Sequence, residues 1–387
     1  MNRREVKRAP VLRFKGFTND WEQRKFENLV SRLSKTSNNE SLPNVTYDDI
    51  KSKENSLNKD ITELTHGKKG IHFNKDDILF GKLRPYLGNI LLARFNGIAV
   101  GDFWVLSPKD NNISSFLFDL IQTSKYKYIS NLSSGSKMPR SDWNLVSKAS
   151  FWVPIQQEQN KIGKIFQLID NLVSLQQRKL RLLKLLKKAT QQNIFASTEC
   201  LPKLKYRNLT GKWQLYRLKD VAKITMGQSP NSKNYTQNPI DHILVQGNAD
   251  IRNGYVFPRI WTTEITKVAN KGDIILCVRA PAGDVGRTKF NVVIGRGVAA
   301  IKGNDFIFQQ LQFMKSSGYW KKYISGSTFE SINSNDIKNA KIFCPSQLEQ
   351  KNISSLLDDI DTSIQIQQKN ILDFKYIKQF LLQNMFI

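Results

Sequence analysis

The sequence predicts an α+β protein made of two like units, each a globular part followed by a long amphipathic helix. The stretch 154–195 occurs again at 345–386, at a constant offset (345 − 154 = 191 and 386 − 195 = 191). Ordered matches at nearly the same offset continue through the residues before each copy. Short apolar runs between turn residues, which are typical of strands, occur there as well. The chain therefore predicts two copies of one fold.

Both copies of the repeated stretch are predicted to be helices with coiled-coil character. Their apolar residues recur at steps of three and four, the spacing of one helix face: Ile162, Ile165, Phe166, Ile169, Leu172, Val173, Leu180 and Leu183, then Ile353, Leu356, Leu357, Ile360, Ile364, Ile371, Phe374 and Ile377. Ser346 followed by Glu349 predicts a capping box. A helix of about 40 residues is about 60 Å long. Because neither could bury so long a stripe alone, we expect the two helices to pack together.

The repeat extends into the globular parts. The matched pairs, in order, are Pro10 with Pro202, Phe14 with Tyr206, Thr18 with Thr210, Trp21 with Trp213, Phe26 with Leu218, Asp77–Phe80 with Asp273–Leu276, Pro85 with Pro281, and Gly135-Ser136 with Gly326-Ser327. The units diverge most at 31–70 and 223–270. Chance similarity of two helices would not produce such ordered matches, so we expect one fold with loop insertions.

Strands and helices are both predicted within each globular part. The strand-like runs are 77–80, 90–95 and 103–106 in the first unit, and 243–246, 273–279, 292–294 and 298–301 in the second. Helical runs at 113–128 and 306–323 each precede a Gly-Ser loop. This mixture supports the α+β class.

Charge and composition narrow the function. The chain has 59 Lys+Arg against 33 Asp+Glu, a formal net charge of +26. Although a lysine-rich composition can simply aid solubility, so large an excess favours a polyanion such as nucleic acid. A basic membrane-surface protein would need an amphipathic terminus or lipidation site, and neither is evident. No apolar run is long enough to span a membrane, the N-terminus has no secretory h-region, and the three scattered cysteines are typical of a reduced cytoplasmic protein.

Polar loops rich in glycine, basic residues and amides occur in both units. Gly allows a close backbone approach, and Arg, Lys, Gln and Asn bind base edges and phosphates, although such loops are more often solvated turns. The predicted DNA contacts are Lys68, Lys69, Lys82, Arg84, Tyr86, Lys137 and Arg140 in the first unit, and Gln228, Ser229, Asn231, Gln246, Asn248, Arg252, Arg279, Arg287 and Arg296 in the second.

Enzyme signatures are largely missing. The chain has no P-loop, and 295–297 lacks the third glycine of a dinucleotide fingerprint. Asn238–Asp241 lacks the second proline and the aromatic residue of an amino-methyltransferase motif, so a turn is expected there. Its histidines (His66, His72 and His242) are not spaced for a metal. Asp77 and Asp273, each directly before an apolar run, suit turns better than catalysis. We therefore predict no catalytic residue and no metal site.

Two variable globular units, each followed by a helix that opens with Pro-x-x-x-Glu-Gln-x-x-Ile, resemble the specificity subunit of type I restriction–modification enzymes. The residues that carry the resemblance are Pro154, Glu158, Gln159 and Ile162 in the first copy, and Pro345, Glu349, Gln350 and Ile353 in the second. The strand-like runs at Asp77 and Asp273, the Gly-Ser loops and the Trp21/Trp213 starts are similar to this family too. The resemblance covers essentially the whole chain.

The resemblance implies two tandem α/β target recognition domains, joined and spaced by two long antiparallel coiled-coil helices with pseudo-twofold symmetry. Under it, 1–153 and 199–344 are the recognition domains, and 154–198 and 345–387 are the spacer helices. Each domain would recognise one half of a bipartite, asymmetric site on double-stranded DNA. A stiff spacer of about 60 Å corresponds to roughly 18 base pairs, so helix length would set the half-site spacing.

The resemblance also implies partners. Two modification (methyltransferase) subunits would dock on the helices, where we expect Glu158, Gln159, Glu349 and Gln350 to contribute, and restriction subunits would complete the nuclease. The chain itself would be a non-catalytic, cytoplasmic specificity subunit without a cofactor, while S-adenosylmethionine, ATP and Mg²⁺ belong to the partner subunits. The stretch 171–198 has basic residues and no Asp, whereas the second helix carries Asp358, Asp359, Asp361 and Asp373. Most of these charges suit a solvated face, but they could also pair one helix with the other.

Two other functions remain open from the sequence. An autonomous DNA methyltransferase or nuclease would need a cofactor motif that the chain does not have. A DNA-binding coiled-coil adaptor or regulator would bind nucleic acid by charge alone. Binding of S-adenosylmethionine by the isolated chain, or co-purification with methyltransferase subunits, would distinguish these possibilities.

Overall fold

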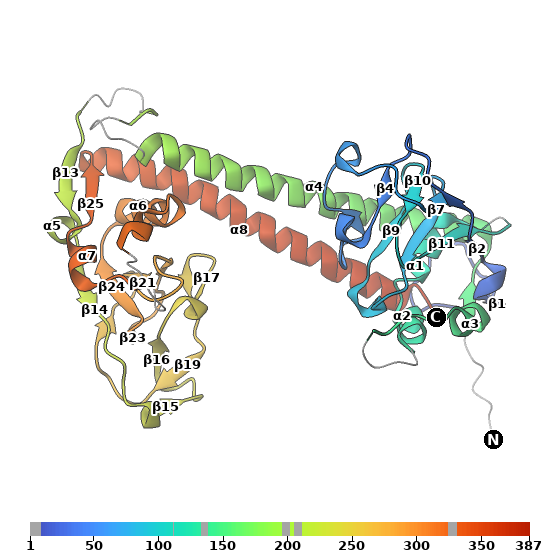
Figure 1. Ribbon diagram of the computed structural model, residues 1–387. Coiled ribbons are helices and arrows are strands. Elements are labelled where there is room, and N and C mark those ends of the chain that lie inside the picture. The colour runs from blue at the N-terminus through green and yellow to red at the C-terminus, as the bar shows by residue number, and fades with distance from the viewer. Residues whose placement is uncertain (1–8, 111, 133–137, 196–201, 205–210, 324–330) are drawn as a thin grey trace, which may run out of the picture. The chain divides into compact units, whose positions relative to one another are not determined.

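The computed structural model describes residues 9–110, 112–132, 138–195, 202–204, 211–323 and 331–387 (Figure 1). The chain divides into two compact units: unit 1 comprises Met1–Gln176 and Asn370–Ile387, and unit 2 comprises Gln177–Lys369. Both repeated stretches are helical, as predicted, and form α4 (Gln156–Phe195) and α8 (Gln347–Asn384). Each unit contains part of both helices together with its own sheets, which confirms the α+β class.

Unit 1 is built around a sheet whose strand order is β2-β11-β8-β9. Its described strands are β1 (Glu22–Lys25), β2 (Val30–Leu33), β3 (Thr36–Ser37), β4 (Asn44–Val45), β5 (Ile50–Lys51), β6 (Ser56–Leu57), β7 (Gly70–Phe73), β8 (Ile78–Gly81), β9 (Ile90–Leu92), β10 (Gly97–Ala99), β11 (Phe103–Pro108) and β12 (Ser150–Val153). Its helices, besides those already named, are η1 (Phe26–Asn28), η2 (Tyr47–Asp49), η3 (Ile61–Glu63), η4 (Pro85–Leu87), α1 (Ser114–Leu120), α2 (Ser124–Asn131) and α3 (Trp143–Lys148). A second sheet has the order β3-β7-β10-β4, and β1-β12 and β5-β6 form pairs.

Unit 2 repeats this plan with a longer central sheet, β14-β24-β21-β22-β18-β17. Its described strands are β13 (Gln214–Arg217), β14 (Lys223–Met226), β15 (Tyr235–Thr236), β16 (His242–Val245), β17 (Ile251–Arg252), β18 (Tyr255–Val256), β19 (Ile260–Thr262), β20 (Val268–Ala269), β21 (Ile274–Cys277), β22 (Val285–Arg287), β23 (Val292–Ile294), β24 (Val298–Lys302) and β25 (Lys341–Cys344). Its own helices are α5 (Leu218–Val221), η5 (Ser232–Asn234), η6 (Asn248–Asp250), α6 (Asp305–Ser316), η7 (Tyr319–Tyr323) and α7 (Ser334–Lys338). The sheet β15-β19-β16-β23-β20 lies at the end of unit 2 that is remote from the helices (Figure 1).

The central strand of each unit separates two cores. In β8, Ile78 and Phe80 pack into the core that contains Trp21, while Leu79 packs into the core beneath β4. In β21, Ile274 and Leu276 pack with Trp213, while Ile275 and Cys277 face the other core. Successive side chains of a strand point to opposite faces, so a strand buried on both faces must be apolar throughout. This is why the sequence has continuous apolar runs at both positions.

The two long helices bury one continuous stripe. Its positions alternate steps of four and three residues, the period of a coiled coil: 162, 166, 169, 173, 176, 180, 183, 187, 190 and 194 in α4, and 353, 357, 360, 364, 367, 371, 374, 378, 381 and 385 in α8. The second set is the first plus 191. The core prediction was wrong for Leu172 and Ile377, which lie off this stripe and are 40% and 47% exposed.

The structure also shows how individual turns and two of the shorter helical runs differ from or agree with the predictions. Asp77 and Asp273 are turn residues, as predicted, because each carboxylate accepts the backbone N–H three residues earlier, from Asn74 (2.7 Å) and Asn270 (2.8 Å). Asn238–Asp241 is a turn, in which the Asn238 carbonyl accepts the N–H of Asp241. The helical run 113–128 is divided, because Thr123 caps a new helix with its side chain. The run 306–323 is divided at Gly318, whose φ of 75° ends the helix.

Candidate nucleic-acid interface

In unit 1 the segment after β8 is tied to the segment before α3. The Arg84 N–H donates to the Pro139 carbonyl and the Ser141 N–H donates to the Lys82 carbonyl, both at 2.8 Å. These bonds bring together four of the predicted DNA contacts: Lys82, Arg84, Tyr86 and Arg140. Arg84 has a left-handed backbone (φ 49°), which is uncommon outside glycine and typical of functional loops.

Asp102 holds this segment together electrostatically. Its carboxylate lies 2.9 Å from Arg140 and 3.4 Å from Lys82. Burial by itself would raise the pKa of Asp102, but the hydrogen bond from Arg140 and the charges of Arg140 and Lys82 lower it overall. The Tyr47 hydroxyl donates to the Asp102 carbonyl (2.5 Å) and accepts the Leu83 N–H (3.1 Å). Burial raises the pKa of Tyr47 to about 12, so this hydroxyl stays neutral.

A hollow of about 480 Å³ opens beside these residues. It is lined by Arg32, Lys82, Trp104, Met138, Arg140, Ser141, Asp142 and Trp143. The Arg32 guanidinium lies 4.9 Å from the centre of a Trp143 ring. Sequence analysis missed Arg32 and Trp143. An arginine in an edge strand and a tryptophan at a helix start have no motif, and the fold alone brings them together.

In unit 2 three loops approach closely enough that only glycine fits between them. A Cβ at Gly227 would lie 2.1 Å from the Gly295 carbonyl oxygen, and one at Gly297 would lie 2.0 Å from that of Gln246. The Gln228 N–H donates to the Ile294 carbonyl (2.8 Å) and the Arg296 N–H to the Ser229 hydroxyl (3.0 Å). The structure therefore brings together Gln228, Ser229, Gln246 and Arg296, with Asn248 and Arg279 adjacent in the chain to bonded residues.

No described hydrogen bond joins the remaining predicted contacts to these two surfaces. Asn231 caps η5, and Arg252 stacks on Phe257 at 4.1 Å. Arg287 pairs with Asp305 (2.5 Å) beside α6. Lys68 and Lys69 are exposed before β7, and no described contact joins them to the hollow. Lys137 and the Gly-Ser loops at 135 and 326 lie outside the described residues.

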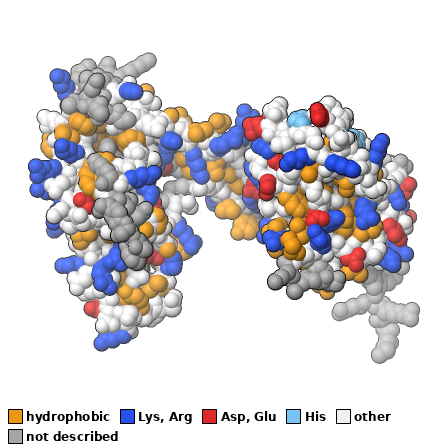
Figure 2. Space-filling model, in the orientation of Figure 1, with side chains coloured by type: hydrophobic (Ala, Val, Ile, Leu, Met, Phe, Trp, Pro, Cys, Tyr) orange, Lys and Arg blue, Asp and Glu red, His pale blue; other side chains and the backbone are white. Residues whose placement is uncertain are grey.

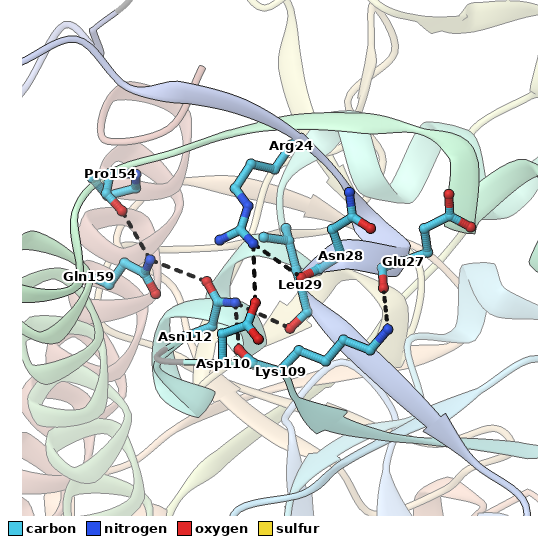
Figure 3. A network of polar contacts seen from close by, with 9 residues as sticks. All are labelled: Arg24, Glu27, Asn28, Leu29, Lys109, Asp110, Asn112, Pro154 and Gln159. Atoms are coloured by element: carbon cyan, nitrogen blue, oxygen red, sulfur yellow. Dashed lines mark hydrogen bonds and ion pairs between the residues drawn. The ribbon is translucent and has the colours of Figure 1, made fainter.

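The start of α4 is locked to unit 1 by the residues that were expected to bind a partner. Both carboxylate oxygens of Glu158 accept from Arg13, each at 2.8 Å. The Gln159 amide donates to the Pro154 carbonyl (3.0 Å) and to Asn112 (3.3 Å), and accepts the Ile113 N–H (3.0 Å). Figure 3 shows this network continuing through Asn112 to the Leu29 carbonyl and, from neighbouring residues, through Asp110 to Arg24.

The start of α8 repeats the lock in unit 2. The Gln350 amide donates to the Pro345 carbonyl (3.0 Å) and accepts from Asn304 (2.8 Å), while Glu349 accepts from the Trp213 indole (3.2 Å). The Ser346 hydroxyl accepts the Glu349 N–H, which is one half of the predicted capping box. Because Glu158, Gln159 and Glu349 are 1%, 4% and 3% exposed, they present almost no surface to a partner; here they hold each helix on its globular part.

The charged residues of the helices form two equivalent ion pairs. Asp170 pairs with Lys378 in unit 1, and Asp361 pairs with Lys187 in unit 2, both at 2.6 Å. The positions correspond (170 + 191 = 361 and 187 + 191 = 378). The prediction that basic residues of the first helix could pair with acidic residues of the second is confirmed for Lys187 and Asp361. The pair of Asp170 and Lys378, in which the acid is on the first helix, was not predicted.

Apolar side chains are also exposed along the helices (Figure 2). They include Leu168, Leu172, Leu175, Leu182, Leu186, Ile366, Ile377 and Phe380, of which Leu168 and Leu175 are each 62% exposed. A solvent-exposed helix face does not normally have leucines at such regular spacing, so this stripe is typical of a protein-binding surface. Among the described residues, no cluster of His, Cys, Asp or Glu could hold a metal ion. Likewise, no helix in the described part of the chain is both long and apolar enough to cross a membrane.

Comparisons with known proteins agree on one family. The model of the type I restriction modification DNA specificity domain matches twice, at 18–185 and 210–373. A putative type I restriction enzyme MjaX specificity subunit from Methanocaldococcus jannaschii is 30% identical, covering 77% of this chain and 72% of that protein. The MjaVIII specificity subunit of the same organism is 23% identical, covering 78% and 76%.

Two solved structures share the fold. A type I restriction-modification S subunit from M. genitalium matches with a TM-score of 0.67 at 14% identity, covering 98% of this chain and 99% of that one. A chain from a study of complex assembly and conformational transition of a type I R-M system matches with a TM-score of 0.59 at 22% identity, covering 94% and 96%.

Proposed function

The chain belongs to the family of type I restriction–modification DNA specificity subunits, and from this premise we propose that each unit recognises one half of a bipartite DNA site. Unit 1 would contact DNA through the surface around Lys82, Arg84, Tyr86 and Arg140. Unit 2 would use the glycine-lined loops that carry Gln228, Gln246 and Arg296. The net charge of +26 supports binding to DNA phosphates. Lysine and arginine side chains are spread over the visible face of unit 2, with few acidic ones between them (Figure 2).

One observation carries the proposal: the two units keep the same backbone frame and change the side chains on it. The bond from Ser141 to the Lys82 carbonyl corresponds to the bond from Ile332 to the Val278 carbonyl, both at 2.8 Å. A duplicated frame with different exposed side chains suits a reader of two unlike half-sites, because side chains at the base edges determine sequence preference.

The helices would space the two half-sites and dock the methyltransferase subunits. The exposed leucine stripe supports docking, since the Glu-Gln residues first expected there are mostly buried. Catalysis, together with S-adenosylmethionine, ATP and Mg²⁺, would belong to the partner subunits. Leu172→Glu should therefore reduce co-purification of the methyltransferase subunit. Lys188→Glu, an exposed change on the same helix but on the flank opposite the stripe, is the matched control.

The main test is genome-wide methylation sequencing of cells that carry this chain with a compatible methyltransferase subunit. A new bipartite motif that disappears without this chain is the expected result. Replacing 1–153 with the corresponding domain of a relative should then change one half-site and leave the other intact. An active, bound methyltransferase that methylates no defined motif would refute the proposal.

A further inference from the structure

Among the described residues that line the unit 1 hollow, Arg32 is the cation without a charged partner. Lys82 and Arg140 also line the hollow, but both pair with Asp102. The Arg32 side chain is exposed, and its guanidinium forms no hydrogen bond or ion pair with any described residue. All five of its N–H donors are therefore available to a ligand.

The Trp143 ring, on which the Arg32 guanidinium stacks, is held in place by other aromatic side chains. Trp143 packs edge-on against Trp104 (5.2 Å, 76°) and Phe26 (6.3 Å, 66°). Trp104 is 4% exposed and stacks on Phe80 (5.4 Å, 21°). Asp142 caps α3 by accepting the Asn144 N–H at 2.8 Å. This series of contacts reaches from the core to the surface, so the ring can hold a planar guanidinium in a preorganised position.

At the equivalent positions, unit 2 has neither the arginine nor the two tryptophans of this stack. Strand register places Ile224 where unit 1 has Arg32, since Leu106 pairs with Arg32 and Ile301 pairs with Ile224. By the same criterion, Ala299 replaces Trp104. Trp104 pairs with Phe80, the third residue of β8, and Ala299 pairs with Leu276, the third residue of β21. The two isolated bridges, Leu83–Arg140 and Arg279–Ser331, place Ser331 at the position of Arg140, and three residues further along Ser334 replaces Trp143. The frame does not require these side chains, so they are specific to what unit 1 binds.

We infer that Arg32, held on Trp143, recognises a guanine in the half-site that unit 1 binds. Arginine donates two parallel hydrogen bonds to guanine O6 and N7 in the major groove, which is the commonest specific contact between proteins and DNA. A guanidinium with free donors and a fixed plane suits that contact. The inference rests on the proposed function and adds a specificity-determining residue to it.

The charges around Arg32 favour a base edge over a phosphate. Asp102 and Asp142 lie at the same hollow as Arg32, Lys82 and Arg140, so two carboxylates offset most of the three positive charges. A phosphate contact would be weakened by the nearby carboxylates, because like charges repel. A neutral guanine edge is not repelled in this way.

The test compares variants of the full chain, each in complex with its methyltransferase subunits. The variants are Arg32→Ala, Arg32→Lys, Trp143→Ala and, as a control that removes a charge from the other end of α3, Lys148→Ala. Methylation sequencing gives the motif, and binding to duplexes substituted at each position of the first half-site gives the specificity. Domain exchange identifies which half-site is read by unit 1. Retained preference at the other positions of the first half-site reports that unit 1 of each variant is folded.

The expected result is a loss of preference for guanine at one position, about 5- to 100-fold for Arg32→Ala. Arg32→Lys should lose it too, because lysine lacks the two-pronged geometry. Trp143→Ala should weaken it at the same position, and Lys148→Ala should leave it intact. If Arg32→Ala weakens all sequences equally and Arg32→Lys restores binding, Arg32 is a phosphate contact and the inference fails. An unchanged motif also overturns it. Absence of any bipartite motif with the unmodified chain would instead refute the proposed function itself.

Discussion

In unit 1 the backbone N–H of Lys82 donates to the Asp102 carbonyl, and in unit 2 the N–H of Val278 donates to the Gly297 carbonyl, both at 2.9 Å. The side chains on these matched positions differ completely. Lys82 and Asp102 form an ion pair at the surface, whereas Val278 is 4% exposed and belongs to a core. The comparison teaches that the backbone bonds maintain the fold while the side chains are free to diverge. A duplicated specificity protein needs this separation.

The helices show the opposite relation, because there the side chains themselves are duplicated. Phe386, two residues after the end of α8, packs against Trp21 and Phe116 in unit 1, and its counterpart Phe195 at the end of α4 packs against Phe306 in unit 2. Ion pairs and the Gln–Pro lock are duplicated as well. Divergence is therefore greater in the globular parts, and the helices keep what both units need.

The largest expected effect comes from shortening the duplicated helices. Deleting 174–180 from α4 and the equivalent 365–371 from α8 removes one heptad from each and preserves the buried stripe. About 10 Å of helix is lost, so the unread gap should shorten by about 3 base pairs. Methylation sequencing measures the gap. Deleting four residues from each helix instead should abolish methylation, because it breaks the stripe, and an unchanged gap after the heptad deletion would disprove the spacer role.

The next largest effect is expected from breaking the contact between Glu158 and Arg13 at the start of α4. Glu158→Ala leaves the Arg13 guanidinium, 13% exposed, without its buried carboxylate. Loss of one partner from such a pair costs about 3 kcal/mol. The free energy of unfolding of the complete chain, measured with a chemical denaturant, should fall by about that amount. Glu27→Ala, an exposed acid in the same unit, is the control; equal stability of the two variants would show that the lock has no energetic role.

The two interhelix ion pairs should differ although their positions are equivalent. Asp361 accepts from Lys187 and also from the Gln309 amide (3.0 Å), and its side chain is 24% exposed. Asp170, which is 37% exposed, accepts from Lys378. Asp361→Asn should therefore cost about 2 kcal/mol and Asp170→Asn about 1 kcal/mol. Denaturant unfolding of the two variants side by side gives the ranking, and the reverse order would contradict this account.

The parts of this molecule that follow from periodicity could be predicted from the sequence. The helix spacing gave α4 and α8 almost to the residue, and continuous apolar runs located β8, β11, β21 and β24, because burial on both faces leaves a direct record in composition. Leu172 and Ile377 were misplaced because their spacing also fits a helix face. Whether a second stripe is buried depends on what the neighbouring helix covers.

The candidate site was harder to predict, for a physical reason. Lys82, Arg84 and Tyr86 were found because they follow a strand in a short polar loop. Arg32 and Trp143 were not, because their relation exists only after β2 and α3 have been brought together. Glu158 was expected, from the family resemblance, to contribute to partner binding. A buried carboxylate is invisible in the sequence unless its partner, here Arg13, is known.

The smallest expected effect is a difference in pH dependence at the two helix crossings. In unit 2 the carboxylates of Asp358 and Asp361 both accept from the Gln309 amide. In unit 1 the corresponding polar group on α1 is Asp119, which is 2% exposed and has one carboxylate oxygen without a partner in the described residues. Burial raises the pKa of Asp119 well above its usual value, Lys378 partly opposes this shift, and Asp170 adds to it.

The sign of the effect follows from proton binding. Between about pH 4, where an unfolded aspartate titrates, and its raised native pKa, Asp119 binds more protons in the folded state. Its contribution to stability is therefore present at low pH and lost as the pH rises through the native pKa. Asp119→Asn should gain stability relative to the unmodified chain as the pH increases from 4 to 8, with little difference at pH 4. Asp49→Asn should behave in the opposite way and at lower pH, because the pKa of Asp49 is lowered on balance: its burial raises the pKa, but hydrogen bonds from Lys59 and Thr46 outweigh it. The contribution of Asp49 is therefore complete above about pH 5 and lost as the pH falls below about 4, so unfolding midpoints from about pH 2 to pH 8 measure both slopes. Parallel curves for the two variants would mean that the buried carboxyl of unit 1 is ionised like any other.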